Sequence, residues 1–112
     1  MYKVIFHLDE AEDYRINLTL NNINNVLADL EEVEVELVVY AQGIRLYFPE
    51  DNPYLERVAD LKNSGVKLAV CNNTLQGMML KTDDLVDGVE TVSSGVGELV
   101  RKQAEGWIYI RP

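Results

Sequence analysis

The sequence alternates short runs of β-forming residues with segments in which apolar residues recur at helical spacing. The run "YKVIFHL" (2–8) is rich in β-branched and aromatic residues, whereas the segment from Ile16 to Leu30 repeats apolar residues at steps of four and three. Strands that alternate with helices are typical of βαβ units. The alternation therefore predicts a three-layer α/β domain, with a mainly parallel sheet between two layers of helices.

The remaining elements are expected to continue the same alternation. Further strands are expected at 33–41, 66–71, 89–92 and 107–110, and further helical segments at 52–65, 73–80 and 95–106. Asp9, followed by Glu12 three residues later, predicts a capped start for the first helix. In the last helix, Val96, Leu99 and Val100 form the expected apolar stripe.

Length and composition limit the classes of protein to which the chain can belong. A chain of 112 residues, 47% of them hydrophobic, fits a single packed domain over residues 1–112. Ten basic against 19 acidic residues give a net charge of −9, which disfavours nucleic acid and anionic membranes as partners. A single cysteine excludes an internal disulfide, and the N-terminal apolar run is too short to span a bilayer. These features predict a cytoplasmic protein.

The ends of the expected strands indicate where a site would lie. In parallel sheets, ligands bind outside the carboxyl ends of the strands. The residues at these ends are His7, Gly43 in "AQG", Cys71 with Asn72, Asn73 and Thr74, and Ser94, Gly95 and Gly97 in "SSGVG". If the strands run parallel, all of these residues lie at one edge of the sheet.

Cys71, the only cysteine, has two interpretations. A thiol at a strand end that leads into a helix faces free backbone N–H groups and the positive end of the helix dipole, both of which favour the nucleophilic thiolate. Asn72, Asn73 and Thr74 could then cap the helix or donate hydrogen bonds to the sulfur or to a bound anion. Alternatively, Cys71 packs as a small hydrophobic residue, and the pattern alone favours this interpretation.

The other candidates are a histidine and a glycine-rich turn. His7, the only histidine, could be a base or an anion contact if its strand lies near that of Cys71, although a histidine without catalytic duty is the favoured interpretation. "SSGVGELV" lacks the lysine of a P-loop and has Val100 where the dinucleotide fingerprint has glycine or alanine. It is interpreted as a strand-to-helix turn capped by Ser94, whose backbone N–H groups could hold a small anion.

No metal or cofactor is predicted, because one histidine and one cysteine make a poor set of ligands. A homo-oligomer is predicted from the aromatic residues outside the helices. Tyr47, Phe48 and Tyr54 lie beside two prolines in an expected loop, and "WIYIRP" ends the sequence. Such residues either cover the core or contact another subunit.

Several stretches resemble the DsrE/DsrF-like family, over essentially the whole chain. They are "AVCNNTL", "DDLVDGVETVSSGVGELVRKQAEGWIYIRP", "VIFHLDE" and "LVVYAQGI". The resemblance implies an α/β/α sandwich with a five-stranded, mostly parallel sheet, assembled as a homotrimer or homohexamer. In sulfur-trafficking relatives, a cysteine at the end of the third strand carries sulfur as a persulfide and passes it to a partner protein, and Cys71 stands at that position. Those relatives continue into an alanine-rich helix with basic residues, whereas this chain has "NNTLQGMML" before Lys81.

The leading hypothesis is a cytoplasmic sulfur-carrier or sulfurtransferase-like protein, with Cys71 as the persulfide site and a sulfur donor or acceptor protein as partner. The residues expected to shape and line the site are Asn72, Asn73, Thr74, Gly43, Ser94, Gly95, Gly97 and His7. The alternative is a non-catalytic oligomeric module that binds a small anionic ligand or a partner protein at the same edge. A relay requires thiolate character, N–H donors and exposure of the sulfur, and the sequence does not determine exposure.

Overall fold

The computed structural model describes residues 1–112. The strands are β1 (Tyr2–Leu8), β2 (Val33–Val39), β3 (Lys67–Cys71), β4 (Val89–Val92) and β5 (Ile108–Ile110). The α-helices are α1 (Asp13–Asp29), α2 (Leu55–Asn63), α3 (Asn72–Gly77) and α4 (Gly95–Ala104), and two 3₁₀ helices are η1 (Ala41–Tyr47) and η2 (Thr82–Asp84). None of the helices is long and apolar enough to cross a membrane.

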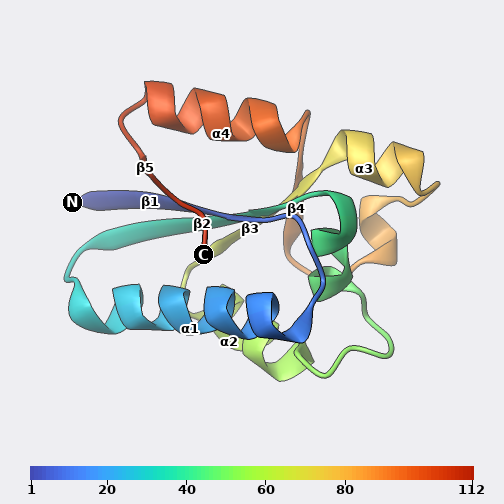
Figure 1. Ribbon diagram of the computed structural model, residues 1–112, viewed down its shortest axis with the longest axis horizontal. Coiled ribbons are helices and arrows are strands. Elements are labelled where there is room, and N and C mark those ends of the chain that lie inside the picture. The colour runs from blue at the N-terminus through green and yellow to red at the C-terminus, as the bar shows by residue number, and fades with distance from the viewer.

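The five strands form one sheet in the order β4-β3-β2-β1-β5, and every pair is parallel. Helices α1 and α2 cover one face of the sheet and α4 covers the other, so the predicted three-layer α/β architecture is confirmed (Figure 1). The strand ends are in step, since Leu8 pairs with Val39, and Cys71 pairs with Val92. The carboxyl ends of the strands therefore meet at one edge, as the sequence predicts.

The two faces of the sheet are buried to very different extents. Twenty buried hydrophobic residues form the core on the face covered by α1 and α2. The face under α4 has a cluster of only six, which are Ile5, Val38, Ala69, Val92, Leu99 and Trp107. Because hydrophobic stabilisation scales with buried apolar area, most of it comes from the first face.

The segment expected to be an aromatic loop is partly helical and covers the core. Tyr47, at the end of η1, is fully buried, and its hydroxyl donates a hydrogen bond to the Leu37 carbonyl at 2.9 Å. Phe48 and Tyr54 are half-buried against the same core. These three aromatic residues therefore need no second subunit to cover them.

The expected cap of the first helix is wrong. The N-cap of α1 is Glu12, whose side chain makes no capping hydrogen bond. Asp9 lies outside the helix, where its carboxylate is 3.3 Å from His7 Nε2 and 3.5 Å from Arg111. The carboxylate thus lies beside the His7 imidazole and the Arg111 guanidinium at the strand ends instead of capping the backbone N–H groups of the helix.

The expected apolar stripe of the last helix is also wrong. Val96 and Val100 are 58% and 67% exposed, whereas Leu99 is buried together with Glu98. Helix α4 is therefore rotated so that a carboxyl group enters the space between helix and sheet. A buried charge needs a compensating partner, and Glu98 finds one in the sheet.

That partner is Lys67 of β3, which also approaches Glu36, a fully buried residue in the middle of β2. Lys67 Nζ lies 3.9 Å from Glu36 Oε1 and 3.7 Å from Glu98 Oε2, and Lys102 Nζ lies 3.8 Å from Glu36 Oε1. Burial, followed by the hydrogen bond and the charge of Glu98, raises the pKa of Glu36 from 4.5 to about 8. The nearby carboxyl group of Glu36 lowers the pKa of Glu98, so the pair holds one proton near neutral pH.

We expect Glu36→Gln to change how stability depends on pH. Between pH 4.5 and about 8 the folded chain keeps the Glu36 proton that the unfolded chain releases, so the contribution of this group falls as pH rises through that window. Glutamine remains neutral throughout. The free energy of unfolding of the variant relative to the natural chain should therefore rise by about 1–3 kcal/mol from pH 5 to pH 8. Urea denaturation at several pH values measures this difference.

Glu34→Gln is the matched control, because Glu34 is an exposed residue on the same strand. Its difference from the natural chain should stay within about 0.5 kcal/mol across the same pH range. A flat difference for Glu36→Gln would show that Glu36 is ionised in the folded chain at neutral pH.

Candidate functional site

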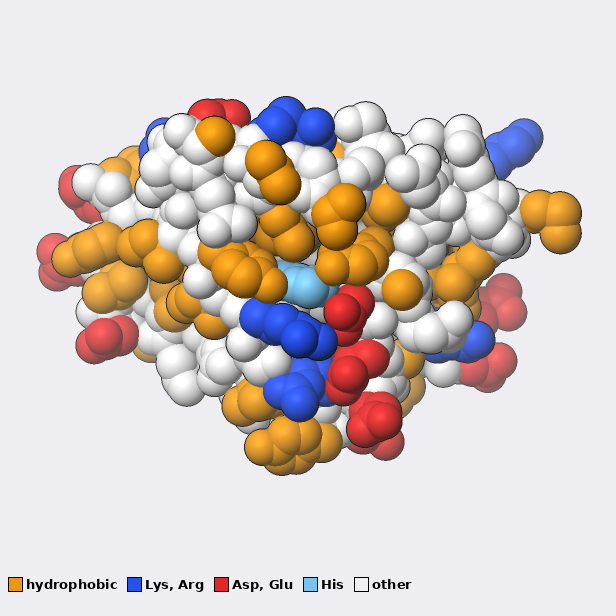
Figure 2. Space-filling model, turned by 45° about the horizontal axis from the view of Figure 1, so that its top comes forward, with side chains coloured by type: hydrophobic (Ala, Val, Ile, Leu, Met, Phe, Trp, Pro, Cys, Tyr) orange, Lys and Arg blue, Asp and Glu red, His pale blue; other side chains and the backbone are white.

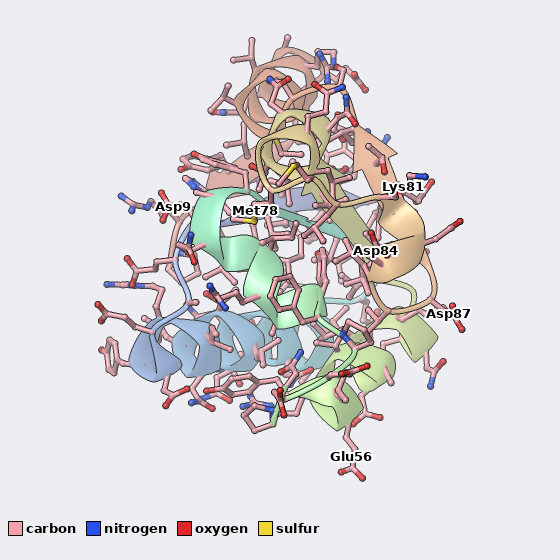
Figure 3. The ribbon with its side chains drawn as sticks, turned by 90° about the vertical axis from the view of Figure 1, so that its right-hand side faces the viewer. Asp9, Glu56, Met78, Lys81, Asp84 and Asp87 are labelled. Atoms are coloured by element: carbon pink, nitrogen blue, oxygen red, sulfur yellow. The ribbon has the colours of Figure 1, made fainter.

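The parallel sheet brings the predicted site residues to one edge, which Figure 3 views with Asp9 at the end of β1 and Met78 at the end of α3. Cys71 is the last residue of β3 and also the N-cap of α3. The neighbouring strand β4 leads through Ser94 into α4. Because β3 and β4 pair in parallel, the first turns of α3 and α4 both begin beside Cys71.

The environment of Cys71 is polar although the residue is buried. Cys71 is 6% exposed, so the open thiol that a relay requires is not present in this single chain. Burial raises the pKa of the thiol. The backbone N–H groups of Gly95, Thr74 and Asn73 and the hydroxyl of Thr74 act against burial, and together they lower the pKa below its ordinary value. The sulfur therefore lies among groups that stabilise a thiolate, which a purely apolar filler would not need.

Thr74 is fixed by a strained segment of backbone. Its hydroxyl oxygen accepts a hydrogen bond of 2.9 Å from the Ala41 N–H, which leaves the hydroxyl proton free to point to Cys71. Ala41 has a φ of 50°, a left-handed conformation that costs about 1–2 kcal/mol for a residue other than glycine. Backbone strain of this kind is concentrated at functional sites.

Two of the predicted glycines allow close packing at the site. A Cβ atom on Gly95 would lie 2.6 Å from a ring carbon of Tyr40, so glycine lets the Tyr40 ring pack against the start of α4. A Cβ atom on Gly43 would collide with the Leu8 carbonyl at the end of β1. Gly43 is thus placed against the sheet, where it holds η1 close to the strand ends.

Ser94 and Gly97 form the predicted cap of α4. The Ser94 hydroxyl accepts a hydrogen bond of 2.8 Å from the Gly97 N–H. This N–H group is therefore occupied, and among the first residues of α4 it is the Gly95 N–H that faces the sulfur.

His7 lies on β1, separated from Cys71 by β2. Its ring stacks on Tyr40 at a centroid distance of 4.8 Å, and its Nδ1 is 2.8 Å from the Tyr109 hydroxyl. Burial lowers the pKa of His7 although Asp9 raises it, so the imidazole is neutral at pH 7. Its Nε2 lies 3.3 Å from the Asp9 carboxylate and has no hydrogen-bond partner.

Sequence reasoning missed Tyr40 and Tyr109, which connect His7 to the Cys71 site. The pKa of Tyr40 is raised by burial first and then by Asp9, Tyr109 and Cys71, so these groups share one electrostatic environment. On the surface, the single histidine is visible between hydrophobic side chains, with basic and acidic side chains beside it (Figure 2). Tyr40 follows β2 and Tyr109 lies in β5, and these two strands flank β1. Their approach to His7 depends on the strand order, which the sequence alone does not give.

A cavity on the side of the sheet covered by α1 does not contain the predicted site. It has a volume of about 590 Å³ and lies between α1, η1 and the loop at 48–54. Among its lining residues are Arg45, Phe48, Tyr54 and Asp84. None of the site residues proposed from the sequence lines this cavity. The Cys71 site is therefore separate from it.

We expect Thr74→Val to make Cys71 less reactive. The substitution removes a hydroxyl that lowers the thiol pKa, so alkylation of Cys71 at pH 7 should be about two- to tenfold slower, the effect of one hydrogen bond. The midpoint of the rate against pH should move to higher pH. Thr19→Val is the control, because its hydroxyl bonds to the Arg15 carbonyl within α1 on the opposite face of the sheet. Equal rates and midpoints in the natural chain and Thr74→Val would contradict the role of this hydroxyl.

Comparison with known proteins agrees with this architecture. No curated protein matches this chain. A protein of unknown function from Methanobacterium thermoautotrophicum, MTH1491, has a solved structure that is 45% identical in sequence, with a TM-score of 0.96 and complete coverage of both chains. The ychN protein of E. coli also matches over both complete chains, with a TM-score of 0.84 at 15% identity, which shows the fold alone. Residues 3–112 match the DsrE/DsrF-like family, and the chain belongs to this family.

Proposed function

We propose that this protein carries sulfane sulfur as a persulfide on Cys71 and transfers it to the thiol of a partner protein. The observation that carries the proposal is the position of the single cysteine. Cys71 is the last residue of β3 and the N-cap of α3, where the neighbouring backbone N–H groups and the Thr74 hydroxyl lower the pKa of its thiol. These groups favour a thiolate in spite of burial, and membership of the DsrE/DsrF-like family adds support.

The chemistry requires no second catalytic residue. The Cys71 thiolate attacks the outer sulfur of a donor persulfide, R–S–SH. A bond forms between Sγ and that sulfur, the bond between the two donor sulfurs breaks, and the donor leaves as R–S⁻. In the second step, an acceptor thiolate attacks the outer sulfur of the Cys71 persulfide and releases Cys71 as thiolate. Each step breaks one sulfur–sulfur bond and forms another, and the second step leaves the acceptor as a persulfide, so no external oxidant or reductant is needed.

The small exposure of Cys71 limits how a donor can approach. With 6% of the residue exposed, a flat protein surface cannot bring a second sulfur into line with Sγ. A small persulfide or an extended loop that carries a cysteine fits this access better. The outer sulfur of a Cys71 persulfide would also extend beyond the buried Sγ, which makes transfer to an acceptor easier than loading.

Sulfur uptake tests the proposal directly. The natural chain, incubated with a small persulfide donor and then desalted, should gain the mass of one sulfur atom, and a thiol acceptor should remove it. Cys71→Ser should gain nothing. Absence of uptake by the natural chain with both a small donor and a protein persulfide donor would overturn the proposal.

The alternative, a non-catalytic module that binds a small anion at the same edge, has less support. The Ser94 hydroxyl occupies the Gly97 N–H that such an anion would need. Under this alternative, anion binding would persist in Cys71→Ser, whereas substitutions of Ser94 and Gly97 would abolish it.

We also propose that the chain assembles with copies of itself, as a homotrimer or homohexamer, in the cytoplasm. Val96 and Val100 are exposed one turn apart on α4, and Ile108 and Tyr109 are exposed on the edge strand β5. Hydrophobic side chains accordingly gather on this side of the molecule (Figure 2). A reducing compartment would keep a single functional thiol available, which supports the proposed location.

We expect Val100→Asp to reduce the size of the assembly, because it places a charge on the proposed contact. Sedimentation velocity at micromolar concentration should give a trimer or hexamer for the natural chain and smaller species for the variant. Tyr14→Asp, on the exposed side of α1, should sediment like the natural chain. A monomeric natural chain would contradict the proposed assembly.

A further inference from the structure

The cavity beside α1 lies at the edge where the strands end. Its walls come from the segments that follow three strands: the start of α1 after β1, η1 with the loop at 48–54 after β2, and residues after α3 that follow β3. Ligands of parallel sheets bind outside such strand ends. The volume, about 590 Å³, is that of a small-molecule site. The cavity therefore has both the position and the size of a ligand site.

Part of the cavity wall is apolar. Ile16 of α1 is 3% exposed and belongs to the hydrophobic core on this face of the sheet. Phe48, Tyr54 and Leu80 are half-buried, pack against the same core and also line the cavity. The apolar groups of a ligand would be stabilised by covering this wall, because both surfaces would then leave water.

The loop that closes the cavity is fixed by hydrogen bonds within the chain. The Asn52 side-chain amide donates to the Leu46 carbonyl at 2.8 Å and to the Phe48 carbonyl at 3.0 Å, and its oxygen accepts from the Tyr54 N–H at 2.9 Å. The Tyr54 hydroxyl donates to the Asp13 carboxylate, which ties the loop to α1. The cavity thus exists without a ligand, and binding requires little ordering of the chain.

The polar part of the lining is strongly acidic. It contains the exposed carboxylates of Asp13, Glu50, Asp51 and Asp84 and a single cation, Arg45. Asp84 is seen at this edge of the molecule in Figure 3. No ion pair within the chain involves any of these five residues. The four carboxylates are therefore not neutralised by the protein itself, and they attract cations to the cavity.

Arg45 is directed to η1 and to an aromatic ring. Its Nε donates to Gln42 Oε1 at 2.7 Å, and its guanidinium lies 5.6 Å from the centre of the Phe48 ring. The ring of Phe48 thus already stacks with one cation, and aromatic faces attract cations. A positively charged ligand would meet carboxylates and aromatic carbon in the same cavity.

We propose that this cavity binds a small organic cation, an amine whose ammonium groups are joined by an aliphatic chain. The ammonium groups pair with the carboxylates, and the chain lies on the apolar wall. A compact metal ion would gain nothing from that wall, and an anion would be repelled by the carboxylates. The net charge of −9 attracts cations to the whole surface, whereas the cavity selects those with an apolar body. Binding here is independent of the chemistry proposed for Cys71.

Titration calorimetry with spermidine, an aliphatic triamine, tests the proposal at constant ionic strength. The natural chain should bind one spermidine saturably, and an equal concentration of Mg²⁺ should not displace it. In NMR spectra, the amide signals that shift on binding should belong to the start of α1, η1 and the loop at 48–54. Equal displacement by Mg²⁺, or shifts spread over the acidic surface, would show only general attraction of cations and would overturn the proposal.

A pair of double variants separates the cavity from the overall charge. Glu50→Gln with Asp51→Asn removes two carboxylates from the lining, and both residues are exposed, so the fold should be preserved. Spermidine should bind this variant about three- to tenfold more weakly, the effect of two exposed ion pairs.

Asp29→Asn with Glu31→Gln is the matched control. It makes the same change in net charge at exposed residues near the amino end of β2, away from the cavity. Spermidine should bind this control within about twofold of the natural chain. Equal weakening of binding in the two double variants would overturn the proposal, and so would an unchanged affinity in Glu50→Gln with Asp51→Asn.

Discussion

The structure depends on the requirement that a parallel sheet be covered on both faces. Each strand must be followed by a crossover, and every strand then delivers its carboxyl end to the same edge. In this chain the crossovers are distributed unequally, with α1 and α2 on one face and α4 on the other. The first face contains the greater part of the core and stabilises the domain, whereas the second has few apolar contacts and contains the ionisable groups. The sheet thus separates the residues that form most of the hydrophobic core from the buried ionisable residues.

The site at this edge combines two conditions that usually oppose each other. A buried thiol is normally a poor nucleophile, because low polarity favours its neutral form. Here burial raises the pKa of the thiol, whereas the N–H groups at the starts of α3 and α4 and the Thr74 hydroxyl lower it below its ordinary value. The site therefore protects the sulfur from solvent and still favours the anion. A cysteine that carries an oxidisable sulfur benefits from both properties, since exposed persulfides and thiolates react readily with small oxidants.

Much of the fold was accessible from the sequence, because the periodicity of apolar residues reflects local constraints. The strand run that ends at Cys71 and the parallel arrangement follow from alternation alone, and so does the gathering of strand ends. The rotation of α4 could not be predicted in this way. Its sequence offers Val96 and Val100 as well as Leu99, and the choice of face depends on Glu98 meeting Glu36 from a distant strand. The glutamate within the apolar run "VEVELVV" was the available signal, but its partner is visible only in three dimensions. The exposure of Cys71 and the approach of Tyr40 and Tyr109 to His7 likewise depend on strand order.

The pairing of the first strand with the last has a consequence for synthesis of the chain. His7 is synthesised before its hydrogen-bond partner Tyr109, which follows 102 residues later in the chain. The imidazole and the sheet edge beside it stay incomplete until β5 is released and docks against β1. Until then, the nascent chain has an unpaired β1 edge. Shielding of this edge by a chaperone would therefore favour the yield of folded protein.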